Sequence, residues 1–187
     1  MSIDSRSTGQ LYSLAGQWLQ RHQALLFLTA LAALSRLLPH PDNITPMAAI
    51  GLFAGAHIHQ RYYFLVPVVA ALISDLLGPG FYAATTMIAV YIGYLGASIV
   101  ARLLLHRRKI AARLPITVVA GAVVFYLISN LGPWWGYYSH DLAGLLACYA
   151  NGVPYLLRSL LGDAFYSVVF FGLYSLWSQT TTAQRYA

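Results

Sequence analysis

Residues 81–109 read FYAATTMIAVYIGYLGASIVARLLLHRRK, a long apolar run that ends in a basic cluster. The 25 residues of 81–105 carry a single charge, at Arg102. A transmembrane helix needs about 20 mostly apolar residues, and Lys and Arg gather on the cytoplasmic side of a membrane. This stretch therefore predicts a membrane-spanning helix whose carboxyl end lies in the cytoplasm.

The composition of the 187-residue chain extends this interpretation to the whole protein. Hydrophobic side chains make up 59% of the residues and charged ones 9%, whereas a soluble domain has about 45–50% and about 25%. So few charges exclude a soluble enzyme, a disordered chain and a coiled coil. The net charge of +6 does not indicate nucleic acid, because the Arg residues lie between apolar runs, where they can contact anionic lipid head groups.

Six apolar segments predict an all-α membrane protein with six transmembrane helices in one domain, residues 23–178. Residues 1–22 predict a cytoplasmic amphipathic segment, either a helix lying in the membrane interface or a solvated extension of the first span. Residues 179–187 predict a cytoplasmic tail. The six predicted spans are 24–38, 47–58, 62–77, 81–105, 114–131 and 154–177.

The segment between the fifth and sixth spans, GPWWGYYSHDLAGLLACYANG, is too broken for a span and too apolar for a free loop. It predicts a long structured outer loop with a short re-entrant or interfacial helix at 142–149. Pro154 suits the first turn of a helix, so the sixth span is expected to begin there.

The distribution of Lys and Arg orients the six spans, with both termini in the cytoplasm. Only Arg36 and Arg158 fall toward the outer side. The nine basic residues on the inner side are Arg6, Arg21, Arg61, Arg102, Arg107, Arg108, Lys109, Arg113 and Arg185.

Polar and aromatic residues gather on the outer side of this topology. Ionisable groups inside a membrane are costly and usually face a cavity or a partner. Two interpretations stand for the charged residues Arg36, Asp75, Arg158 and Asp163. Either they line an outward chamber, or they form buried ion pairs that fix helix packing. Arg36 is expected to pair with Asp75 or Asp163, beneath His40 and Asn43.

Two further groups on the outer side have alternative roles. Trp134 and Trp135 indicate either an interfacial aromatic belt or a stacking lid over a ring-containing ligand. Asn130 and Asn151 can hydrogen-bond a ligand or cap helix ends. A separate motif, Gly51 and Gly55, forms a GxxxG that lets span two approach another helix closely, in this chain or in a partner.

Motifs of other chemistry are missing from the sequence. There is no P-loop, no GxSxG elbow and no zinc signature, so the chain is expected to be no enzyme and to need no cofactor. His40, His140 and Cys148 remain weak candidates for a metal ligand.

Several long stretches resemble a family of small bacterial membrane proteins and, in organisation, the S components of energy-coupling-factor (ECF) vitamin transporters. The resemblance covers about residues 35–172 and implies a bacterial inner-membrane protein with a ligand pocket closed by outer loops. The nearest analogy is the solitary vitamin B12 type, whose cobalt-ligating cysteine has no counterpart in SDLLGPGFY. The stretches are RLLPHPDNITPMAAIGLFAGA, LVPVVAALISDLLG, NLGPWW and DLAGLLACYANGVPYLLRSLLGDAFYSVVF.

The resulting hypothesis is a membrane-embedded binding protein for a small nutrient, such as cobalamin or a precursor, taken from the outer side. It implies a small-molecule substrate, the lipid bilayer and an ECF-type coupling protein with ATPase subunits as partners. The alternatives are an assembly factor whose outer loops dock a partner protein, and an intramembrane enzyme in which Asp75, Asp163 and a histidine converge. The candidate binding residues are Arg36, His40, Asp42, Asn43, Asp75, Tyr82, Asn130, Trp134, Trp135, Tyr138, His140, Asn151, Arg158 and Asp163.

Overall fold

The computed structural model describes residues 23, 25–39, 43–58, 61–78, 80–106 and 108–186, with side chains up to residue 176. These residues form helices joined by short connections, and no strand occurs among them. The predicted all-α fold is confirmed on this part of the chain, whereas the predicted amphipathic segment 1–22 lies outside it. The helices are Leu25–Leu37, α2 (Met47–His57), α3 (Leu65–Leu77), α4 (Ala84–Leu105), α5 (Ile110–Ser129), α6 (Leu131–Tyr137) and α7 (Leu142–Tyr186).

Three of these helical segments are long and apolar enough to cross a membrane: Ala84–Leu105, Ile110–Tyr137 and Leu142–Leu176. Of the six predicted transmembrane helices, these three are confirmed in length and apolar character, and the other three are not. The helices Leu25–Leu37, α2 and α3 have only 10–17 residues. At 1.5 Å per residue, α2 with 11 residues and α3 with 13 reach about 17–20 Å, against a hydrocarbon core of roughly 30 Å.

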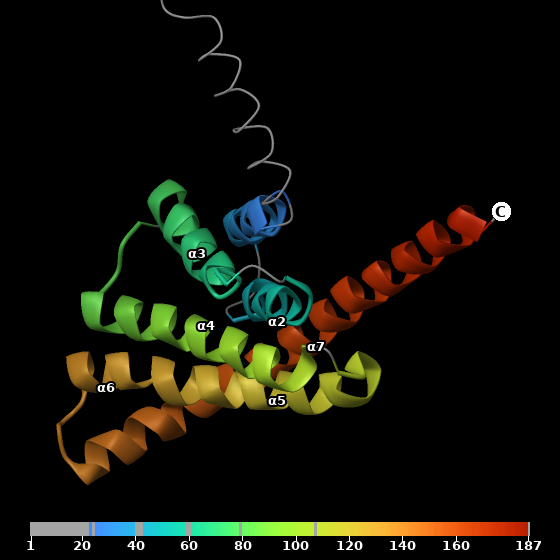
Figure 1. The fold of residues 1–187 in the computed structure, drawn as a ribbon. Helices are drawn as coiled ribbons and strands as arrows, with labels where there is room; N and C mark the ends of the chain where they lie inside the picture. The colour runs from blue at the N-terminus through green and yellow to red at the C-terminus, as the bar shows by residue number, and fades with distance from the viewer. Residues whose placement is uncertain are drawn as a thin grey trace, which may run out of the picture.

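The long helices form the frame onto which the short ones pack. Figure 1 shows α4 and α5 side by side, with α6 continuing the line of α5 and α7 crossing them obliquely. Helix α2 lies against both α4 and α7. The outward faces of the long helices stay apolar, with Leu103 exposed by 71% and Leu161 by 69%, as expected for contact with lipid.

The connection before α7 differs from the prediction of a long structured outer loop. Helix α5 passes through Asn130 into α6, and only residues 138–141 separate α6 from α7. The short helix expected at 142–149 is the first part of α7, and the predicted tail 179–187 contains its end at Tyr186.

Helix α7 begins at Leu142 and not at Pro154, because Asp141 caps it. The Asp141 carboxylate accepts a hydrogen bond from the backbone N–H of Gly144 at 2.7 Å and from the Ser139 hydroxyl at 2.8 Å. These two bonds hold the pKa of Asp141 below its usual range. Pro154 lies inside the helix, a position that transmembrane helices tolerate when neighbouring groups satisfy the freed backbone.

Small residues allow the close packing between α2 and α4. A Cβ on Gly55 would lie 2.7 Å from the Ser98 carbonyl oxygen, and one on Gly51 would lie 2.7 Å from the Ser98 hydroxyl. The GxxxG motif therefore packs against α4 of the same chain, which resolves the alternative that the sequence left open.

We expect Gly55→Ala to destabilise the protein by about 1–3 kcal/mol, since the new methyl group would press on backbone atoms of α4. Gly172→Ala is the matched control, because a Cβ at Gly172 in α7 meets nothing within 4 Å. Melting temperatures of the two variants in detergent provide the measurement. Equal melting temperatures would contradict the close contact at Gly55.

Candidate functional site

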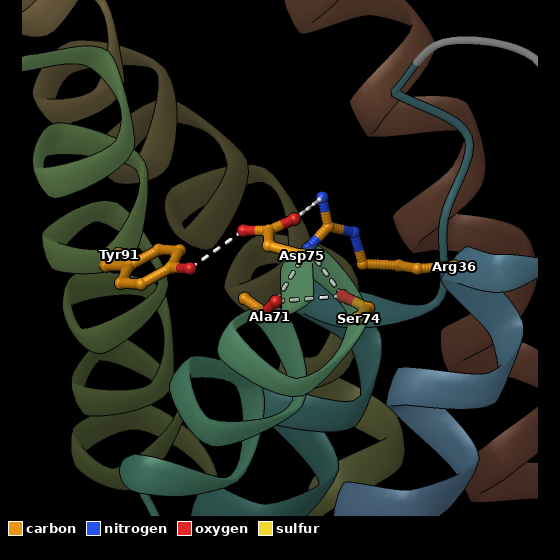
Figure 2. Close-up of polar contacts among 5 residues, drawn as sticks. All are labelled: Arg36, Ala71, Ser74, Asp75 and Tyr91. Atoms are coloured by element: carbon orange, nitrogen blue, oxygen red, sulfur yellow. Dashed lines mark hydrogen bonds and ion pairs between the residues drawn. The ribbon is translucent and has the colours of Figure 1, made fainter. Parts of the chain in front are cut away.

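A buried ion pair joins the first helix to α3. Arg36 Nη2 lies 2.9 Å from Asp75 Oδ1, and Arg36 Nη1 donates to Ser74 Oγ at 2.8 Å and to the Ala71 carbonyl at 3.3 Å. Figure 2 shows Arg36 reaching the Asp75 carboxylate from one side and Tyr91 reaching it from the other. The predicted pairing of Arg36 with one of two aspartates is confirmed, and the partner is Asp75.

The two members of this pair differ in burial. The Asp75 side chain is 0% exposed, whereas Arg36 is 20% exposed. Asp75 Oδ2 accepts a hydrogen bond from the Tyr91 hydroxyl at 2.7 Å, so both carboxylate oxygens have a polar contact. A fully buried carboxylate needs such compensation. The ion pair with Asp75 therefore fixes the position of the Arg36 guanidinium.

Arg36 faces a cavity of about 670 Å³ between the helices. Lining residues such as Tyr82, exposed by 40%, and Tyr155, exposed by 48%, also reach the surface, so the cavity is open. Its lining combines amides, hydroxyls and aromatic rings with one basic and one acidic side chain. The lining residues are Arg36, Asn43, Thr45, Ala48, Tyr82, Thr86, Val90, Tyr94, Phe125, Ser129, Asn130, Pro133, Tyr138, Cys148, Asn151, Gly152, Tyr155, Ser159 and Asp163.

Seven of the residues proposed from the sequence line this cavity: Arg36, Asn43, Tyr82, Asn130, Tyr138, Asn151 and Asp163. They come from the end of the first helix, the segment before α2, the segment before α4, the α5–α6 junction, the α6–α7 connection and α7. The structure thus brings together groups that are distant in the sequence. Asn43 Nδ2, for example, donates a hydrogen bond at 3.4 Å to Ser159 Oγ, 116 positions away.

The amides of the cavity also hold the local structure. Asn130 Nδ2 donates to the Tyr126 carbonyl at 2.8 Å, at the junction of α5 and α6. Asn151 Nδ2 donates to the Tyr138 hydroxyl at 3.1 Å and so ties α7 to the preceding connection. Both asparagines therefore have structural partners while they line the cavity.

Trp134, Trp135 and His140 do not line the cavity, although Tyr138 in the same segment does. Trp135 stacks on His140 with ring centroids 4.6 Å apart, and Trp134 donates from Nε1 to the Ser139 carbonyl at 3.1 Å. Trp135 is 59% exposed. The arrangement suits amphipathic rings at a membrane interface better than a lid over a ligand.

Two other proposed residues that the structure describes, Asp75 and Arg158, also fall outside the lining. Arg158 is exposed and its guanidinium lies 5.8 Å from the Tyr155 ring centroid, so it does not pair with Asp163. His40 and Asp42 lie outside the described residues. Within the described ranges, no three histidine, cysteine or acidic side chains gather where they could hold one metal ion.

Cys148 is buried in the cavity wall, where its Sγ donates to the Asn130 carbonyl at 3.4 Å. His140 does not share this wall, so the two do not form a ligand set.

Sequence reasoning missed the part of the lining that α4 contributes and, on α7, Gly152, Tyr155 and Ser159. Thr86, Val90 and Tyr94 follow a spacing of four along α4, which places them on one helix face. The same helical spacing recurs along α7, and this stripe of mostly polar residues was the available signal. It consists of Cys148, Asn151, Gly152, Tyr155, Ser159 and Asp163.

In the part of the chain that the structure describes, the fold and the site define an all-helical protein with three membrane-length helices and an open cavity of mixed polar and apolar lining. Over residues 17–185 the chain matches the DUF6580 model, described as a family of unknown function, and it belongs to that family. No curated protein and no solved structure matches the chain.

Proposed function

We propose that this protein is a multi-pass protein of the bacterial inner membrane that binds a small, ring-containing nutrient from the outer side. All six apolar segments lie within the bilayer in this proposal, the three short helices packing against the three long ones. The termini are cytoplasmic.

The cavity is the observation that carries the proposal. Ligand pockets have volumes of about 300–1,000 Å³ and combine apolar walls with a few placed polar groups. The 670 Å³ cavity falls in this range, and Tyr94 and Phe125 supply ring faces beside the amides of Asn43 and Asn130. The volume favours compounds with one compact ring system over a corrinoid such as cobalamin.

The position of the cavity supports entry from the outer side. It is lined from segments that the distribution of basic residues places outside, such as Asn43, Tyr82 and Tyr138. The basic end of α4, by contrast, lies at the opposite end of that helix from Thr86, about 30 Å away over a 22-residue helix.

The resemblance to S components adds a mode of uptake. In this proposal the protein captures the nutrient and an ECF-type coupling protein with ATPase subunits drives its release inward. The chain itself has no nucleotide-binding motif, so energy for uphill transport has to come from such a partner or from an ion gradient.

The alternatives have weaker support. An assembly factor that docks a partner protein predicts a flat or filled outer surface, and the open cavity argues against it. An intramembrane enzyme requires Asp75, Asp163 and a histidine to converge, yet Asp75 does not line the cavity with Asp163 and His140 packs on Trp135 outside the lining.

Native mass spectrometry of the gently solubilised protein tests the proposal. We expect a co-purified small molecule and stabilisation by a member of a panel of thiamine, riboflavin, biotin, cobalamin and cobinamide. A ligand at a hundred times its Kd stabilises the folded state by about 2.7 kcal/mol, which is readily measured as a rise in melting temperature. A protein without an adduct that responds to no panel member would contradict the proposal, whereas a stably bound polypeptide would favour the assembly factor.

A further inference from the structure

One carboxyl group in the cavity lacks a partner. Asp163 in α7 lines the cavity and its residue is only 4% exposed. Among the residues that the structure describes, no hydrogen bond or ion pair reaches its carboxyl group. Arg158, the basic residue nearest in sequence, is exposed and lies over the Tyr155 ring instead.

This situation contrasts with that of Asp75. Both aspartates are buried, but Asp75 has Arg36 and Tyr91 as partners and does not line the cavity. A deeply buried carboxylate with no protein partner is costly unless the cavity supplies a contact, and proteins keep such groups mainly at sites of function. Asp163 is therefore as buried as a structural residue, but it lacks the hydrogen bonds and ion pairs that a structural carboxylate has.

The charges around the cavity do not balance when Asp163 is ionised. Arg36 is neutralised by Asp75 behind it, so an ionised Asp163 leaves one net negative charge on the lining. Within the described part of the chain, the lining has no other Lys, Arg, His, Asp or Glu side chain, and its remaining ionisable side chains are phenols and a thiol. These are Tyr82, Tyr94, Tyr138, Cys148 and Tyr155.

We propose that the cavity selects a ligand with one positive charge attached to a ring, and that Asp163 is the counter-ion of this charge. The inference rests on the proposed function and adds to it the chemical class of the ligand. The rings of Tyr94 and Phe125 pack on each other with centroids 4.9 Å apart and both line the cavity, so they offer aromatic contacts to the ring and to the cation. The Ser159 hydroxyl, one helical turn before Asp163, offers a second polar contact.

Three nearly isosteric probes test this charge preference directly: benzamidinium, benzamide and benzoate. They share a planar ring and carry charges of +1, 0 and −1. Their affinities are measured by ligand-detected NMR with the wild type, with Asp163→Asn, and with Asp141→Asn as a control. The control removes the same charge from the exposed connection outside the cavity, and asparagine can still cap a helix.

For the wild type and the Asp141→Asn control we expect benzamidinium to bind about tenfold to hundredfold more tightly than benzamide, and benzoate most weakly. This difference in affinity corresponds to the energy that one hydrogen bond to a charged group contributes. In Asp163→Asn the preference for benzamidinium should fall to less than about threefold, with the affinity for benzamide maintained.

Several outcomes would overturn the inference. These are equal or tighter binding of benzamide or benzoate by the wild type, a preference for benzamidinium that survives in Asp163→Asn, and no binding of any probe at millimolar concentration. If Asp163→Asn fails to fold, the relative affinities of the three probes for the wild type decide whether the cavity prefers a cation. A co-purified neutral or anionic adduct in native mass spectrometry would overturn the inference while leaving the proposed function intact.

Discussion

Replacing Arg36 by methionine is expected to lower the free energy of unfolding by about 3–5 kcal/mol, because it leaves the buried Asp75 carboxylate without its counter-ion. Asp75 is 0% exposed and cannot recover this loss by hydration. The Tyr91 hydroxyl would remain its one strong contact. Denaturation by SDS in mixed micelles, followed by circular dichroism, measures the change.

Arg158→Met is the matched control for this prediction. Arg158 is the other arginine assigned to the outer side, but it is exposed and has only a ring contact at 5.8 Å. Its replacement should change stability by less than about 0.5 kcal/mol. Similar losses of stability in Arg36→Met and Arg158→Met would show that the buried Arg36–Asp75 pair contributes no more than an exposed arginine.

Two further variants separate the charge from the contact. Asp75→Asn should lose less stability than Arg36→Met, because Arg36 is partly hydrated and keeps the Ser74 and Ala71 acceptors. The double variant Arg36→Met/Asp75→Leu should recover much of the loss, since replacing a buried ion pair by apolar residues is often close to neutral. If Asp75 acts only as a brace, Asp75→Asn lowers the melting temperature and preserves ligand affinity in the folded fraction.

The second large effect concerns ligand retention. We expect Val90→Trp to weaken retention of the co-purified molecule by about tenfold to hundredfold, because an indole in the cavity wall occupies space that the ligand needs. The adduct intensity in native mass spectra provides the measurement, alongside the melting temperature of each variant.

Ile88→Trp serves as the comparison. It adds the same side chain two residues earlier on α4, where Ile88 is 55% exposed and does not line the cavity. This variant should retain the adduct at the wild-type level. A Val90→Trp protein that folds and still carries the adduct would place the ligand elsewhere.

Local patterns in the sequence determined the helical class and most helix boundaries. The predicted segments 47–58, 62–77 and 81–105 differ by three residues or fewer at each end from α2, α3 and α4. Apolar runs, prolines and basic clusters determine the conformation and membrane placement of neighbouring residues, so these signals can be read directly from a single sequence. The sequence also shows that the apolar runs 47–58 and 62–77 are shorter than the roughly 17–25 residues of a full span.

Tertiary structure alone decided which of these parts meet. Whether Arg36 pairs with Asp75 or Asp163, and whether Gly51 and Gly55 face this chain or a partner, depends on contacts between distant segments. The start of α7 shows the same limit, because the local preference of Pro154 for a first turn gave way to the Asp141 cap and to packing along the helix. The unpaired state of Asp163 also appeared only in three dimensions: helix geometry turns Arg158 outward and Asp163 into the cavity, although five positions separate them in the sequence.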